Sequence, residues 1–457
     1  MKKCKVICSG IAAALSAAVL LSACGAQTEP VQTPVTDVSP TQTTAELLSA
    51  GRDVVTTAAP NADDAGSLTD SAEFNEAFSK RDLSGEYDRA EAAAITFNGT
   101  DVQSTSEGVR FSGSDVIISS PGTYILSGTM DNGSVIVDVG KEDKVQLVLD
   151  GVAIHSETFA AIYVAQADKV FVTLEAGTVS TLSNGGSFIQ KDDNNVDAVI
   201  FSKDDLTFNG SGALTLIAPE KHGIVCKDDL VFTDGAYTIT ASCHAISAKD
   251  SVSIAGGSFA LTAGKDGIHA ANNDDNTLGN IYIAGGDFNI TVEDDGIHAN
   301  ALVQIDDGTF TIFASEGIEG TYIRINEGSI SISASDDGMN AARKSTAFTP
   351  TIEINGGSID VEMGPGDTDG IDVNGNLIIT GGTIKVTGSS AFDYDGSVTF
   401  TGGTVYINGQ QVSTIPTQMM GGRGGMMHGN MGGMGGMNGM GGGRGGRGRS
   451  AVPGDVY

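Results

Sequence analysis

Short alternating runs of apolar and polar residues repeat along residues 94–412. Runs such as 258–262 and 287–291 place an apolar side chain at every second position, which is the period of a β-strand. A Gly-Gly or Asp-Gly pair precedes most of these runs, and a triplet of the form acid-Gly-Ile recurs in phase with the pairs. The pattern therefore predicts three short strands in each repeat.

The triplet returns every 21 or 22 residues, apart from longer steps that carry insertions near residues 272–279 and 343–350. Turns this short leave no room for useful hairpins, so each strand must pair with its equivalent in the next repeat. We predict an all-β fold, a parallel β-helix with three parallel sheets, apolar columns inside and glycine at corners that need positive φ. An antiparallel sandwich is the alternative, but it would not keep the turns and acids in phase.

Stacked repeats bring polar residues into columns, with neighbours roughly 4.8 Å apart. We call the residues before the glycine the pre-glycine column, and those after the isoleucine the post-isoleucine column. The pre-glycine column reads Asp197, His222, His244, Asp266, Asp295, Glu316, Asp337 and Asp369. The post-isoleucine column reads Ser247, His269, His298, Glu319, Asn340, Asp372 and Asp393.

Stacked carboxylates repel one another by about 1 kcal/mol per pair in water, so this edge favours a counterion. Ca²⁺ accepts six to eight oxygen ligands in loose geometry and is the cofactor that we expect. The expected ligands are Asp266, Asp294, Asp295, Glu316, Glu319, Asp336, Asp337, Asp369 and Asp372. A solvated acidic ladder without metal is the alternative.

Two histidines, His269 and His298, fall one coil apart in the post-isoleucine column. Such a pair can bind a transition metal or serve as acid and base. The alternative is a ladder of imidazoles exposed on the surface.

Both ends of the chain differ from the repeats. Residues 1–24 combine lysines, an apolar run and Leu21-Ser22-Ala23-Cys24, which resembles the bacterial lipobox, so we expect a lipoprotein signal peptide with lipidation at Cys24. An ordinary export signal with an accidental cysteine is the alternative. Residues 25–93 are rich in Thr, Ser, Pro and Asp, and residues 413–457 in Gly, Met and Arg, so we expect a disordered spacer and a disordered tail. The protein should lie outside the cytoplasm, anchored by lipid to the membrane at the cell surface.

The net charge is -32, which repels nucleic acid and anionic lipid headgroups and attracts divalent cations. We therefore expect no nucleic-acid partner, contact with the membrane only through the lipid, and a monomer. The two cysteines of the folded part, Cys226 and Cys243, fall in different columns. Two free, half-buried thiols are expected, with a disulfide across coils as the alternative.

Several motifs resemble a known family. They include Ser/Cys-Lys-Asp-Asp-Leu at 202–206 and 226–230, Asn280-Ile281-Tyr282-Ile283-Ala284-Gly285-Gly286, and Ser315-Glu316-Gly317-Ile318-Glu319-Gly320. Over residues 78–412 the chain is similar to the bacterial cell-surface carbohydrate-binding proteins with a pectate-lyase-like β-helix. The resemblance implies a right-handed parallel β-helix that binds Ca²⁺ and acidic or plant cell-wall polysaccharide, generally without demonstrated lyase activity.

Three functions follow from the sequence. The first is binding of an acidic, pectin-like polysaccharide, with Ca²⁺ bridging protein and uronate carboxylates and with His269, His298, Tyr282 and Tyr322 as candidate carbohydrate contacts. The second is a Ca²⁺-dependent polysaccharide lyase, for which Lys265 is the catalytic candidate because it is the basic residue beside the pre-glycine column. The third is a structural adhesin or spacer that binds no glycan.

Overall fold

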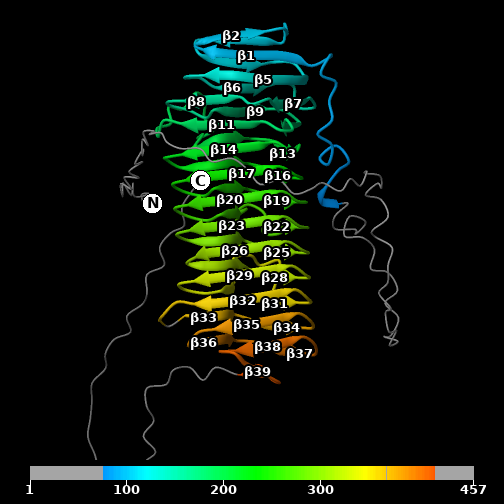
Figure 1. Ribbon diagram of the computed structural model, residues 1–457, viewed down its shortest axis with the longest axis vertical. Coiled ribbons are helices and arrows are strands. Elements are labelled where there is room, and N and C mark those ends of the chain that lie inside the picture. Colours follow the sequence, from blue (N-terminus) through cyan, green and yellow to red (C-terminus); the bar gives the residue numbers. More distant parts are fainter. Residues whose placement is uncertain (1–75, 367, 417–457) are drawn as a thin grey trace, which may run out of the picture. The chain divides into compact units, whose positions relative to one another are not determined.

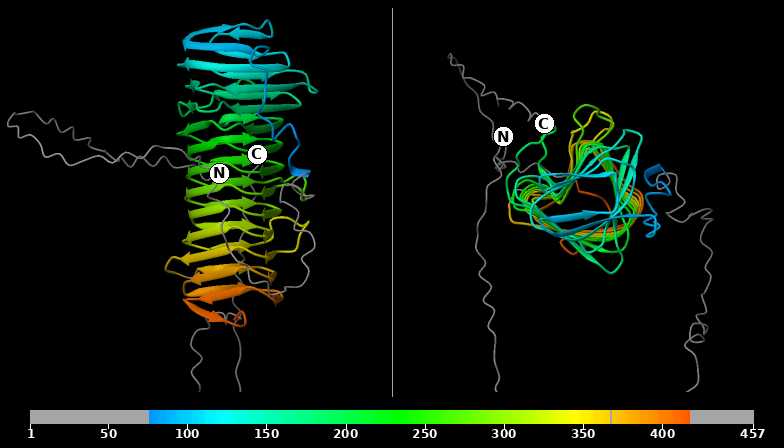
Figure 2. Two further views of the ribbon diagram at one scale, coloured as in Figure 1. Left: turned by 45° about the vertical axis from the view of Figure 1, so that its right-hand side comes forward. Right: turned by 90° about the horizontal axis from the view of Figure 1, so that it is seen from above.

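The computed structural model describes residues 76–366 and 368–416, which form a stack of coils with three strands in each coil (Figure 1). Each strand pairs in parallel with the equivalent strand of the next coil, and the coils superpose when viewed along the stack (Figure 2). The parallel β-helix predicted from the sequence is confirmed.

The strands form three parallel ladders. Ladder A contains β5 (Gly122–Met130), β7 (Lys144–Leu149), β10 (Lys169–Leu174), β13 (Asp205–Asn209), β16 (Asp229–Phe232), β19 (Ser251–Ile254), β22 (Asn280–Ile283), β25 (Leu302–Ile305), β28 (Tyr322–Ile325), β31 (Thr351–Ile354), β34 (Asn376–Ile379) and β37 (Val398–Phe400). Ladder B contains β8 (Ala153–Ser156), β11 (Val179–Asn184), β14 (Ala213–Ala218), β17 (Ala236–Ala241), β20 (Ser258–Ala263), β23 (Asp287–Val292), β26 (Thr309–Ala314), β29 (Ser329–Ala334), β32 (Ser358–Met363), β35 (Thr383–Thr387) and β38 (Thr404–Ile407). Ladder C contains β4 (Asp115–Ile118), β6 (Val135–Asp138), β9 (Ile162–Gln166), β12 (Ala198–Ser202), β15 (His222–Cys226), β18 (Ile246–Ala248), β21 (Ile268–Ala270), β24 (Asp295–Ala299), β27 (Glu316–Gly320), β30 (Met339–Ala341), β33 (Asp369–Val373) and β36 (Ser390–Tyr394).

Antiparallel strands close the two ends of the stack. At the start, β1 (Ala93–Gly99) pairs with β2 (Asp101–Ser104), and β3 (Val109–Ser112) pairs with β4. At the other end, β39 (Gln410–Val412) folds back on β38. These strands cover edges that would otherwise be open to pairing with another chain.

Apolar side chains stack in columns inside the coils. Ile268, Ile297 and Ile318 are in register from coil to coil and are fully buried. The rings of Phe259 and Phe288 stack with centroids 4.9 Å apart, and a phenylalanine of the next coil continues the stack. The stacked apolar columns therefore form a core that continues from coil to coil, as the period of the sequence predicts.

Glycine has a steric cause at two positions that recur in many of the coils. A Cβ on Gly296 would lie 2.5 Å from the carbonyl oxygen of Gly317, so the position after the acid has no room for a side chain. Gly257 and Gly286, each the second member of a pair, have φ of 113° and 122°, a region that disfavours other residues. Both glycine signals in the sequence thus have a steric cause.

Residues 76–92, which we call the strap, run along ladder A before the first coil begins. The Phe78 ring is 3% exposed and lies 5.9 Å from the ring of Tyr282 on β22. Asp82 is also buried, accepts a hydrogen bond of 2.6 Å from the Thr207 hydroxyl and pairs with Lys169 at 2.9 Å. The sequence placed these residues in the disordered spacer, and the structure differs because Phe78 and Asp82 have partners in the solenoid.

The expected signal peptide, the lipidation site Cys24, most of the spacer and most of the tail lie outside the described residues. The division of the chain at these points therefore stays a prediction. Within residues 76–366 and 368–416, no helix is long and apolar enough to cross a membrane.

The expectation of two free, half-buried thiols is wrong in two respects. Both Cys226 and Cys243 are buried, at 1% and 3% exposure. Cys226 is free, whereas Cys243 is disulfide-bonded.

Candidate functional site

Two adjoining pockets, which together we call the groove, lie along ladder C and share His244 and His269. The first has a volume of about 600 Å³ and is lined by residues from Asp193 to Asp274, and the second has about 330 Å³. The second pocket is lined by His244, Lys265, Asp266, His269, Asp294, Asp295, His298, Glu316, Glu319 and Lys344. Members of both polar columns, as far as Glu319, therefore open into one groove.

The register of ladder C confirms the post-isoleucine column from Ser247 to Asp393. In the pre-glycine column Asp295 is in register with Glu316. One assignment upstream is wrong, because Ala198 and not Asp197 is in register with His222. The Asp197 carboxylate still lies 3.8 Å from Nε2 of that histidine.

The pre-glycine side chains bond to the backbone of the next coil. Nδ1 of His244 accepts from the N–H of Asp266 at 3.3 Å, and Oδ1 of Asp266 accepts from the N–H of Asp295 at 3.3 Å. Asp337 does the same for the N–H of Asp369 at 3.1 Å. Part of the column's composition therefore has a structural cause, since these side chains satisfy backbone donors at the bend before each glycine.

Four imidazoles from the two columns form one stack along the groove. Ring centroids are separated by 5.0 Å between His222 and His244, 4.4 Å between His244 and His269, and 5.1 Å between His269 and His298. His269 is only 8% exposed, so the exposed ladder of imidazoles is excluded. Burial and the neighbouring imidazoles lower the pKa of His222 and of His269 well below the usual value, so both rings are neutral at pH 7.

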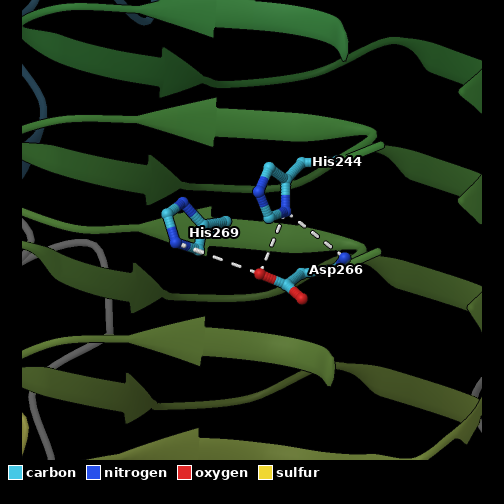
Figure 3. A group of neighbouring side chains, drawn as sticks. All are labelled: His244, Asp266 and His269. Carbon is cyan, nitrogen blue, oxygen red and sulfur yellow. Dashed lines mark hydrogen bonds and ion pairs between the residues drawn. The ribbon is translucent and has the colours of Figure 1, made fainter. Parts of the chain in front are cut away.

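Asp266 joins two of these rings (Figure 3). Its Oδ2 lies 3.0 Å from Nδ1 of His244 and 3.9 Å from Nε2 of His269. Burial opposes ionisation of this carboxyl group, but the contact with His244 and the nearby imidazoles outweigh it and hold the Asp266 pKa well below its usual value. Asp266 is therefore an ionised carboxylate between two rings.

The next coils along the groove carry crowded carboxylates. Nδ1 of His298 lies 2.7 Å from both Oδ2 of Asp295 and Oε2 of Glu319, and Nζ of Lys344 lies 2.5 Å from the other oxygen of Glu319. Burial disfavours the imidazolium, but the two carboxylates outweigh it and raise the pKa of His298 to about 10. Burial also opposes ionisation of Glu319, yet His298 and Lys344 lower its pKa to about 2.

Other carboxyl groups of this region bind their protons more tightly than usual. Burial first, and then the charges of neighbouring acids, raise the pKa of Glu316 to about 8, of Asp372 to about 7 and of Asp337 to about 6. Burial likewise raises the pKa of Asp295 to about 7. The repulsion expected from the sequence is therefore present, and protons relieve it when no cation is bound.

Three clusters along the groove bring metal-ligand atoms within 4.8 Å of one another. They are His244, Asp266 and His269; Asp266, Asp295 and His298; and Asp295, Glu316 and Glu319. A fourth cluster, Asp205, Asp228 and Asp229, lies in the Lys-Asp-Asp motifs and was not predicted. Among the described residues, the other expected ligands, Asp294, Asp336, Asp337, Asp369 and Asp372, belong to no such cluster.

Lys344 is a residue of the candidate site that the sequence did not indicate. It comes from the insertion at 343–350, which is anchored where the Ser345 hydroxyl donates to the carbonyl of Asn276 in the other insertion. The statement that Lys265 is the basic residue beside the column is therefore incomplete, since both lysines line the groove. The long step of 32 residues between Asp337 and Asp369 did indicate an insertion in the sequence. It gives the length of the loop but not the direction in which the loop folds.

The candidate carbohydrate contacts do not meet in space. His269 and His298 line the groove on ladder C, whereas Tyr282 and Tyr322 lie on ladder A. The Tyr282 hydroxyl donates to Asp306 at 2.7 Å and the Tyr322 hydroxyl to Glu353 at 2.5 Å. No single surface therefore presents all four residues.

Comparison with known proteins gives one family. The family model described as "Carbohydrate-binding domain-containing protein" matches residues 112–368 and 315–413. A protein of that description from Acetivibrio thermocellus is 38% identical over 152 residues, which are 33% of this chain and 53% of the relative, so the chain spans about half the length of that curated relative. A solved structure of "the polysaccharide lyase-like protein from C. thermocellum, Gadolinium derivative" is 25% identical, covers 70% of this chain and 95% of its own, and has a TM-score of 0.34. The match over most of the solenoid shows that the chain belongs to the family of carbohydrate-binding domain-containing proteins.

Proposed function

We propose that the groove binds an acidic polysaccharide and that Ca²⁺ at Asp295, Glu316 and Glu319 takes part in binding. The observation that carries this proposal is the convergence of the three carboxyl groups within 4.8 Å in the groove of a protein of this family. Burial raises the pKa values of Asp295 and Glu316, and a bound cation would offset this cost of ionisation.

The donors at this cluster fit Ca²⁺. Ca²⁺ prefers carboxylate and amide oxygens in loose geometry, and the cluster supplies three carboxyl groups. Asn340 follows Glu319 in the post-isoleucine column and donates to Glu316 at 3.0 Å. Its Oδ1 is buried and has no hydrogen-bond partner among the described residues, so it is a further oxygen that a cation could use. Bound Ca²⁺ would supply the positive charge that joins these oxygens to the carboxylates of a sugar.

Lysines along the groove favour an anionic glycan. Lys227 and Lys249 line the first pocket, and Lys265 and Lys344 line the second. Burial disfavours the charge on Lys344, but Glu319 outweighs it and raises the Lys344 pKa, so this ammonium group stays protonated. A uronate carboxylate could therefore pair with cations along much of the groove.

The cationic groups beside the proposed Ca²⁺ site suit binding better than lyase chemistry. A lyase needs a base that removes the proton at C5 of a uronate, whereas His298 and Lys344 both have raised pKa values and stay protonated at neutral pH. These two groups can pair with a carboxylate but cannot accept a proton. Lys265 remains the candidate base if cleavage occurs.

Affinity electrophoresis in gels that contain polygalacturonate tests the proposal. We expect retardation that EDTA abolishes and that Glu316→Gln and Glu319→Gln weaken. Asp360→Asn is the matched control, because Asp360 lies on ladder B, where it faces Lys385 at 3.8 Å. Retardation that persists in EDTA would exclude the Ca²⁺ bridge, and no retardation would exclude the acidic glycan. Release of unsaturated uronate in the same mixture would assign the lyase function instead.

We also propose that the protein acts at the cell surface, held by a lipid on Cys24. The support is the lipobox-like Leu21-Ser22-Ala23-Cys24 after a basic and apolar start. Incorporation of labelled palmitate into the expressed protein, lost in Cys24→Ala, is the expected result. Labelling that is unchanged in this variant would contradict the proposal.

A further inference from the structure

We propose that His244, Asp266 and His269 form a second metal site, which takes a transition metal of the Zn²⁺ class and not Ca²⁺. The inference does not depend on the proposed function, because it rests on a different cluster and a different donor set. Figure 3 shows the three side chains converging from two successive coils, with Asp266 and His269 in the same coil.

The spacing of the donor atoms suits Zn²⁺. Tetrahedral coordination with Zn–N and Zn–O bonds near 2.0 Å separates neighbouring ligand atoms by about 3.3 Å. The two distances from Oδ2 of Asp266, 3.0 Å to His244 and 3.9 Å to His269, lie on either side of this value. All three ligand atoms lie within 4.8 Å of one another, so binding would draw the two imidazoles closer to a shared ion.

Two of the three ligands are already held by outer hydrogen bonds. Oδ1 of Asp266 accepts from the backbone N–H of Asp295 at 3.3 Å, which leaves Oδ2 for the metal. Nδ1 of His269 lies 3.2 Å from the hydroxyl of Ser247, which leaves Nε2 facing Asp266. Such outer partners fix the orientation of ligands in metal sites.

The donor set determines the class of ion. Two imidazole nitrogens and one carboxylate suit Zn²⁺ and related ions, whereas Ca²⁺ prefers oxygen throughout. The next histidine of the stack is not available in the same way, since Nδ1 of His298 contacts two carboxylates at 2.7 Å. His244 and His269 are therefore the pair that can bind, and Nδ1 of His244 would exchange the backbone N–H of Asp266, from which it accepts at 3.3 Å, for the ion.

The site is buried but open to the groove. The three side chains are 3% to 8% exposed, while His244 and His269 line both pockets. Three protein ligands leave a fourth position for water or for an oxygen of a ligand in the groove. An ion at this place would thus be accessible to small molecules.

Calorimetric titration of Zn²⁺ into the full chain, stripped with a chelator and held in excess Ca²⁺, tests the site. We expect one Zn²⁺ per chain, and Co²⁺ in place of Zn²⁺ should give the intense visible absorption of tetrahedral coordination. His269→Gln and Asp266→Asn should each weaken binding by roughly 100-fold. His155→Gln is the matched control, because that ring bonds to Ser183 and Glu157 outside the groove, and it should change nothing.

The outcomes separate this site from the Ca²⁺ cluster. Glu316→Gln should weaken Ca²⁺ binding and leave Zn²⁺ binding intact. Ser247→Ala keeps every ligand, so it should weaken Zn²⁺ by about 10-fold even if His269→Gln fails to fold. Absence of Zn²⁺ heat and of the Co²⁺ spectrum would overturn the proposal, as would equal affinity in wild type, His269→Gln and Ser247→Ala.

Discussion

The two halves of the ladder C edge have the same backbone and different chemistry. Up to β21 the columns present His222, His244 and His269, which stack face to face and include rings that stay neutral. From β27 onward they present carboxyl groups such as Glu316 and Asp372, whose pKa values rise because burial and like charges oppose ionisation. Stacking in register thus fixes where a side chain lies. The type of residue decides whether the charge of the column must be balanced by a cation.

His298 stands at the boundary between the halves, and its loss should have the largest effect. His298→Gln removes the positive charge between Asp295 and Glu319, which should cost about 3 kcal/mol because buried carboxylates lose their partner. Urea unfolding in the presence of a chelator measures this loss of stability. His269→Gln removes a neutral ring and should cost about 1 kcal/mol. Equal losses in the two variants would show that the halves do not differ in charge.

Ca²⁺ should stabilise the carboxylate half and not the imidazole half. At a concentration of 100 times its dissociation constant, Ca²⁺ should add about 2.7 kcal/mol to the free energy of unfolding. The gain should disappear in Glu316→Gln and persist in His244→Gln, as measured by unfolding at pH 8 with and without EGTA. A gain lost in His244→Gln would place the ion in the other half.

The glycines test whether the two halves share their steric constraint. Gly296→Ala should cost about 2 kcal/mol, because the new Cβ would lie 2.5 Å from the carbonyl oxygen of Gly317. Ala245 occupies the equivalent position in the imidazole half and is fully buried there. Ala245→Gly should cost only about 0.5 kcal/mol, through the added freedom of the unfolded chain. Thermal unfolding compares the stabilities of the two variants. An unchanged stability in Gly296→Ala would show that the backbone adjusts to the new side chain.

The two halves should respond to pH in opposite directions, with the smallest expected change. Glu316 has a pKa of about 8 in the folded protein against an ordinary 4.5, so its contribution is complete below pH 4.5 and is lost as the pH rises through 8. Asp266 has a lowered pKa, so its contribution is present above the ordinary value and is lost as the pH falls. In Glu316→Gln, the change in the free energy of unfolding between pH 5 and pH 8 should be smaller by about 1 kcal/mol, after screening by solvent. An unchanged slope would contradict this assignment.

The fold could be predicted from the sequence because stacking demands strict repetition. Ile268, Ile297 and Ile318 must face inward in successive coils, so their spacing reveals the period, and the glycines reveal the corners. The two columns of the edge follow from the same register, which is why His269, Glu319 and Asn340 were placed correctly.

The missed features all depend on contacts that have no period. Lys344 reaches Glu319 from an insertion whose path is set by a hydrogen bond to another insertion. The contact between His244 and His269 joins two different columns, and side-chain direction decides it. Phe78 lies in a short segment with no sustained apolar period, where nearby Leu83 is exposed, so the sequence did not indicate which apolar side chain is buried.

The strap has a consequence for the order in which the molecule assembles. Phe78 packs against Tyr282, roughly 200 residues later in the chain (282 − 78), while the first coil begins only at Ala93. Contacts of such sequence separation form slowly, because the intervening chain must first be brought into place. The strap is thus the first described segment to be synthesised and among the last to dock. It can dock only after the stack of coils has formed at least as far as β22.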